Sequence, residues 1–192
     1  MCKTSRIELH SHSPFSNLRL LDAISTIEDL IQTSADLGLS GIAITDHETV
    51  AAHVKAIQKV RELKEKGKIS PDFKLILGNE IYLVNSLEEV RDNYQSGVTK
   101  FPHFLLLAKD KDSHEMLREL SSQSWSQSFY TGTMERVPTT KAQLEEVIRR
   151  NPNKLIGSSA CLGSESSIHI LNGDYDKARE FLKWCSELFG EG

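Results

Sequence analysis

The stretch "ISTIEDLIQTSADLGLSGIAITDH", residues Ile24 to His47, indicates the fold class, because a helical periodicity is followed within it by a strand pattern. Apolar residues first recur at helical spacing, and Gly38 marks the predicted end of that helix. The run GIAI, residues 41–44, then predicts a buried strand, and Asp46 and His47 come directly after it. An ionisable pair at the end of a buried strand costs desolvation energy unless a partner or a cation offsets it, so this strand end is a candidate site.

The same alternation of strand and helix continues along the chain. The apolar patterns predict strands at residues 6–9, 41–47, 73–84, 103–110 and 154–162, and helices at residues 24–37, 51–66, 113–127, 141–150 and 175–189. The polar stretch "YTGTMERVPTT", residues 130–140, is expected to be an ordered loop. Strands that alternate with helices indicate a parallel sheet with right-handed crossovers, either an open sheet or a barrel.

Length and composition exclude several classes of protein. The chain has 192 residues, which favours one domain, and its 39% hydrophobic and 26% charged residues are typical of a globular protein. No apolar run approaches a membrane span and the first residues lack a signal core, so we expect a cytoplasmic protein with no membrane partner. Three widely spaced cysteines form neither a disulfide framework nor a zinc knuckle, so any metal must depend on histidine and carboxylate.

Candidate metal ligands lie at the predicted ends of several strands. In "ELHSHSPFS", residues 8–16, two histidines stand two residues apart, and on a strand their side chains point to the same face, toward one metal ion or toward water. In a barrel, catalytic groups gather at the carboxyl ends of different strands. The candidates are His10, His12, Asp46, His47, Glu80, Cys161 and, at the start of its strand, His103. Such a nitrogen and oxygen shell suits zinc, manganese or iron rather than calcium.

Each candidate also has a purely structural interpretation. Glu80 in "GNE" could pair with a lysine, and a lone His103 could be an ordinary core or edge histidine. The remaining histidines are expected to play no part in the site: His53 and His114 are predicted to be solvated on polar helical surfaces, and His169 to pack at the start of a short helix.

The ordered motifs HxH, "LLDA", "AITDH", "GNEIYLV", "HFLLLAKD" and "GSSACLGSE" resemble the PHP (polymerase and histidinol phosphatase) family, most closely the N-terminal PHP domain of the bacterial DNA polymerase III alpha subunit. The resemblance covers residues 6–189. It implies an α/β fold, a distorted (β/α)7 barrel whose mouth holds up to three divalent metal ions (zinc, manganese or iron), and hydrolysis of phosphoesters. Some polymerase-attached members resemble a 3′-5′ proofreading exonuclease, whereas others have lost ligands and serve as a scaffold.

The resemblance also implies a role for each matching residue. The metal ligands would be His10, His12, Asp22, His47, Glu80, His103 and Cys161, with Glu80 bridging two ions and with Glu80 and His47 as the catalytic residues. Asp46, beside His47 in the same motif, would orient that histidine from outside the ligand shell. The partners implied are DNA or another phosphoester substrate and the remainder of the polymerase alpha subunit.

One departure from the family concerns the last strand, where its members carry an Asp-x-His pair. No such pair follows Cys161, so we expect a single PHP domain, residues 1–192, incomplete at its C-terminus, with about five of seven strands and little activity by itself. Three functions remain open. They are a phosphoesterase or proofreading exonuclease domain of a replicative polymerase in DNA replication, a non-catalytic metal-braced module of that polymerase, and a free-standing phosphatase similar to histidinol phosphatase.

Overall fold

The computed structural model describes residues 6–18 and 23–190, and the chain divides into two compact units, Met1–Asn79 and Glu80–Gly192. Each unit is described by itself. The first contains β1 (Ile7–Glu8), the 3-10 helix η1 (Pro14–Leu18), α1 (Ile27–Asp36), β2 (Gly41–Ile44), α2 (His53–Glu65) and the first part of β3 (Lys74–Val84). The second contains the rest of β3, the π-helix η2 (Glu88–Asp92), β4 (His103–Ala108), α3 (Lys111–Ser126), β5 (Phe129–Thr131), β6 (Met134–Arg136), β7 (Pro138–Thr140), α4 (Lys141–Arg150), β8 (Leu155–Ser158), α5 (Glu165–Leu171) and α6 (Tyr175–Phe189).

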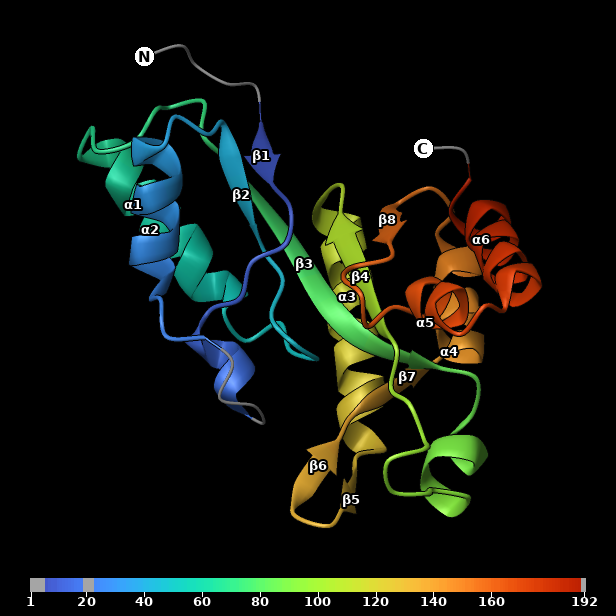
Figure 1. Ribbon diagram of the computed structural model, residues 1–192. Coiled ribbons are helices and arrows are strands. Elements are labelled where there is room, and N and C mark those ends of the chain that lie inside the picture. Colours follow the sequence, from blue (N-terminus) through green and yellow to red (C-terminus); the bar gives the residue numbers. More distant parts are fainter. Residues whose placement is uncertain (1–5, 19–22, 191–192) are drawn as a thin grey trace. The chain divides into compact units, whose positions relative to one another are not determined.

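In the first unit, β1, β2 and β3 form a parallel sheet, with Ile7 opposite Gly41 and Gly41 opposite Lys74. Helices α1 and α2 lie against this sheet and against each other (Figure 1). The core between sheet and helices consists of buried apolar side chains: Ile27, Ile31, Ile42, Ile44, Ala52, Ala56, Val60, Leu63, Ile69 and Phe73. A Cβ on Gly41 would lie 2.4 Å from the Lys74 carbonyl oxygen, so close strand approach requires glycine at this position.

Local signals fix both ends of α1. Thr26 and Asp29 form a reciprocal capping box at its N-terminus, in which each side chain accepts the other residue's backbone N–H. At the other end the chain turns at Gly38, whose φ of +78° is easily adopted only by glycine, as the sequence predicts. The strand that follows therefore starts at a defined point and carries its polar residues, Asp46 and His47, just beyond its end.

In the second unit, the C-terminal part of β3 pairs with β7 in parallel, β4 lies beside β3, and β8 pairs with β4 antiparallel. Helix α3 packs on β4, β7 and α4, and α6 packs on α5 and β8 (Figure 1). The largest fully buried side chains of this unit are Phe104, Ile81, Leu83, Leu106, Leu117, Leu120 and Leu144.

The α/β class and the order of elements are confirmed, and the predicted bounds of α4 and α6 match the structure. Three expectations about secondary structure are wrong. The sheet is not wholly parallel, because β8 runs antiparallel to β4. The stretch expected to be a loop contains the β5–β6 hairpin, which turns at Gly132 (φ +64°), followed by β7. His169 lies well inside α5 rather than at its start.

No helix within residues 6–18 and 23–190 combines the length and apolar character needed to cross a membrane.

Candidate functional site

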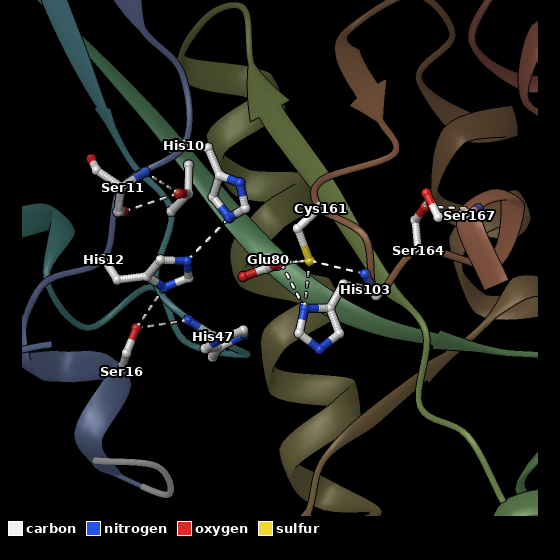
Figure 2. Close-up of polar contacts among 12 residues, drawn as sticks. His10, Ser11, His12, Ser16, His47, Glu80, His103, Cys161, Ser164 and Ser167 are labelled. Carbon is white, nitrogen blue, oxygen red and sulfur yellow. Dashed lines mark hydrogen bonds and ion pairs between the residues drawn. The ribbon is translucent and has the colours of Figure 1, made fainter. Parts of the chain in front are cut away.

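The HxH pair follows β1 directly, and the structure brings its two rings together. The Nε2 atoms of His10 and His12 are 3.1 Å apart, and the ring centroids are 5.0 Å apart (Figure 2). Two imidazole nitrogens at this distance share either a proton or a cation, because two lone pairs facing each other repel. Both side chains are half-buried, so a ligand can reach them from solvent.

His47 joins this pair within the first unit. Its ring centroid lies 4.5 Å from that of His12, and the residue is 7% exposed. The strand β2 positions His47, since only two residues separate the end of that strand from it. Three imidazoles from two neighbouring strand ends, those of His10, His12 and His47, thus form one cluster.

A buried hydroxyl network supports the cluster from behind. The Oγ of Ser16 lies 3.0 Å from His12 Nδ1 and accepts the backbone N–H of His47 at 3.1 Å (Figure 2). The same hydroxyl donates to Asp46 Oδ1 at 2.9 Å. Asp46 also accepts the backbone N–H of Ser13 at 2.6 Å and the Ser13 hydroxyl at 2.8 Å. Asp46, Ser13 and Ser16 are at most 1% exposed.

Asp46 therefore holds the loop that carries the HxH pair. The expectation that it orients the neighbouring His47 ring needs correction, because the Asp46 carboxylate bonds Ser13 and Ser16 and acts through Ser16 on the ring of His12. Burial raises the pKa of the Asp46 carboxyl above its usual value, although the hydrogen bonds from Ser13 and Ser16 oppose this shift.

Asn79, which sequence reasoning missed, fixes the chain after β2. Its Nδ2 group donates to the carbonyl oxygens of Asp46, at 2.8 Å, and Thr49, at 3.1 Å, and the residue is 1% exposed. Beside it, His53 Nε2 hydrogen-bonds the Gly78 carbonyl oxygen at 2.9 Å. His53 is 1% exposed, so the prediction that it is solvated is wrong.

The second unit holds a carboxylate, an imidazole and a thiol together. Glu80 lies inside β3 at 1% exposure, and its Oε1 atom is 2.9 Å from His103 Nδ1 at the start of β4. Cys161 lies beyond the end of β8, and its Sγ is 3.4 Å from His103 Nδ1 and 3.9 Å from Glu80 Oε1 (Figure 2). Cys161 thus belongs to the turn after the strand rather than to the strand itself.

Gly163 shapes this second group through its backbone. Its N–H donates to Cys161 Sγ at 3.3 Å, and its carbonyl accepts the backbone N–H of His103 at 3.0 Å. A Cβ at Gly163 would stand 3.3 Å from the His103 ring. The turn therefore brings the Cys161 thiol to the His103 imidazole.

One predicted ligand, two further histidines and one further cysteine are not among the described residues of these two groups. Asp22 lies outside the described residues. His114 is half-buried on α3 rather than freely solvated, and burial lowers its pKa. His169 Nε2 is 3.8 Å from Glu165 Oε1, one turn earlier on α5. Cys185 is partly buried on α6, and burial raises its pKa to about 11.

The donor atoms in both units fit a divalent metal. Neutral imidazole nitrogen, carboxylate oxygen and thiolate sulfur are the ligands that zinc and related first-row metals prefer. The first unit offers the three imidazoles, and the second offers Glu80, His103 and Cys161. Each group therefore consists of residues able to bind such an ion.

Known proteins resemble this chain over nearly its whole length. The family model described as the PHP domain matches residues 8–192. A DNA-directed DNA polymerase of Bacillus phage SPbeta is 54% identical over 199 residues, which cover 96% of this chain and 15% of the polymerase. The DNA polymerase III subunit alpha of Borreliella burgdorferi is 30% identical over 184 residues, or 96% of this chain and 14% of that subunit.

Among solved structures, a Bifidobacterium adolescentis protein classed as a metal-dependent phosphoesterase matches 94% of this chain and 55% of its own length, with 21% identity and a TM-score of 0.40. Similarity at that level says nothing about substrate. The chain spans about one seventh of the length of the polymerases it matches, so it corresponds to a small part of each of those proteins.

Proposed function

Because the chain belongs to the PHP domain family, we propose that it is the metal-binding phosphoesterase domain of a DNA polymerase related to the bacterial DNA polymerase III alpha subunit. The proposed metal ligands are His10, His12, Asp22, His47, Glu80, His103 and Cys161, the set that resembles the family pattern. The proposed substrate is a phosphodiester, with a DNA 3′ end as its specific form, because the relatives are DNA polymerases.

One observation carries the proposal: the described donors occur in clusters rather than singly. In the first unit, His10 and His12 have their Nε2 atoms 3.1 Å apart. In the second, Glu80 and His103 share a 2.9 Å contact with Cys161 close by. A carboxylate at 1% exposure is costly to keep ionised, and a cation offsets that cost better than a half-buried histidine does.

Metal binding would require particular protonation states of the chain's own residues. The imidazoles of His10, His12 and His47 must be neutral to ligate, and Glu80 must be ionised. The Gly163 N–H donates to Cys161 Sγ and so holds the sulfur beside His103. A divalent ion, when bound, supplies a low-pKa water and neutralises charge on the phosphate. Binding through imidazole should therefore weaken below about pH 6.5, where free histidine protonates.

Metal content after dialysis tests the binding part of the proposal. We expect zinc or manganese to remain in the native chain and to fall in Glu80→Gln, which keeps the shape of the side chain but removes its charge. Glu165→Gln is the matched control, because Glu165 lies on α5 and pairs with Lys141 at 2.8 Å. Equal metal content in the native protein, Glu80→Gln and a His10→Ala, His12→Ala double variant would overturn the ligand assignment.

Hydrolysis tests the catalytic part. The metal-loaded domain, with the strand that carries the family's Asp-x-His pair included, is incubated with bis(p-nitrophenyl) phosphate and with a 3′-labelled oligonucleotide. Release of product that Glu80→Gln abolishes and Glu165→Gln preserves would support the phosphoesterase. If metal is bound and both substrates stay intact, the non-catalytic, metal-braced module replaces it.

A further inference from the structure

The hydroxyl of Ser16 has three polar neighbours and can satisfy them in only one way. A serine hydroxyl has one proton to donate and lone pairs that accept. The backbone N–H of His47, 3.1 Å away, is a donor and takes one lone pair. Asp46 Oδ1, 2.9 Å away, already accepts the Ser13 backbone N–H, so it is an acceptor toward Ser16 as well.

This arrangement determines the proton on His12. Since the Ser16 proton goes to Asp46 Oδ1, the oxygen can only accept from the third neighbour, His12 Nδ1, at 3.0 Å. The conclusion holds even if Asp46 is protonated, because a proton on Oδ2 would face Ser13 Oγ and leave Oδ1 an acceptor. His12 Nδ1 must therefore carry hydrogen, and in the neutral ring the lone pair then lies on Nε2.

We propose that Ser16, held by Asp46, is a positioning residue that fixes His12 as the Nδ1–H tautomer and so presents the Nε2 lone pair for metal binding. The ring geometry agrees, because Nε2 is the atom of His12 that faces His10 Nε2, 3.1 Å away. The same hydroxyl also binds the His47 backbone, so one buried oxygen couples residues after β1 to the end of β2. The metal part of this inference rests on the proposed function, but the tautomer does not.

Nitrogen-15 NMR of the metal-free chain, labelled at histidine, tests the tautomer directly, with His12→Gln identifying the His12 signals. In the native protein we expect the Nδ1–H form, which is the less common tautomer of free histidine. Ser16→Ala should restore the ordinary Nε2–H form. Ser13→Ala is the matched control, because it removes another buried hydroxyl bound to Asp46 and leaves the contact between Ser16 and His12 in place.

Zinc titration against a competing chelator supplies the second measurement. Ser16→Ala should weaken binding by roughly 10–100-fold, as loss of a hydrogen-bond partner behind a ligating histidine does, whereas Ser13→Ala should stay close to the native value. A native His12 in the Nε2–H form, or spectra unchanged in a folded Ser16→Ala, would overturn the inference. If the native chain binds no zinc, the proposed function fails, and the native spectrum alone still decides the tautomer.

Discussion

Replacing Asp46 with alanine should destabilise the first unit strongly, because three buried donors lose their acceptor. These are the backbone N–H of Ser13 and the hydroxyls of Ser13 and Ser16. An unsatisfied buried amide costs about 1–3 kcal/mol, and each lost hydroxyl bond about 0.5–1.5 kcal/mol. The variant also no longer has to bury an ionisable carboxyl, whose raised pKa reflects a desolvation cost, and this offsets part of the lost stability. The expected decrease in unfolding free energy is therefore about 2–4 kcal/mol.

The asparagine variant separates the hydrogen bonds from the charge. An amide oxygen in place of Oδ1 keeps the bonds from the Ser13 N–H and from Ser16, and the amide nitrogen can donate to Ser13 Oγ. Asp46→Asn should therefore cost only about 1 kcal/mol, the net worth of one hydrogen bond. Exposed Asp36, which accepts from Gln32 at 3.0 Å, is the control, and Asp36→Ala should stay within about 0.5 kcal/mol of the native value.

Urea unfolding with chelator present measures these differences, and hydrogen exchange at the Ser13 amide reports locally on the same bond. Exchange there should accelerate in Asp46→Ala and change little in Asp46→Asn. The reasoning would be refuted if Asp46→Ala unfolded at the native urea concentration, or if the asparagine and alanine variants lost equal stability.

Three further predictions concern other parts of the chain. Burial, assisted by Arg118, lowers the pKa of His114, so the unfolded chain takes up a proton first and stability should fall as pH drops through about 6.5; pH-dependent unfolding of His114→Gln should lack that component. Because burial raises the pKa of Cys185 to about 11, iodoacetamide at pH 8 should modify exposed Cys161 faster than Cys185, and equal rates for these two cysteines in peptide mass spectrometry would contradict this. A Cβ at Gly157 would meet the Phe189 ring at 2.6 Å, so Gly157→Ala should lower unfolding free energy by about 1–3 kcal/mol, and an unchanged thermal midpoint would count against the packing described.

Sequence periodicity was sufficient for the elements with strong local signals. Helix α4 begins at a capping box formed by Thr140 and Gln143, and its bounds were predicted correctly. The direction of β8 was not predictable in the same way, because strand direction depends on how the connecting segments pack. The β5–β6 hairpin is short and polar, and Gly132 was its one clear turn signal.

The sequence indicated some residues of the candidate site and not others. The histidine motifs were visible because ionisable residues stood at apolar strand ends, whereas Ser16 and Asn79 were not, since serine and asparagine are common in any loop. The burial of His53 was recoverable, because it stands on the same helical stripe as Ala56, Val60 and Leu63, all of them buried.

Asn79 also bears on how the first unit finds its strand alignment during folding. Alternate residues of a strand face opposite sides, so sliding β3 by one position against β2 would turn the Asn79 amide away from the Asp46 and Thr49 carbonyls. The contact between His53 and the Gly78 carbonyl would be lost in the same slip. A mispaired sheet would thus bury polar groups without partners. The Asn79 amide and the His53 imidazole therefore favour the native strand register over a shifted one.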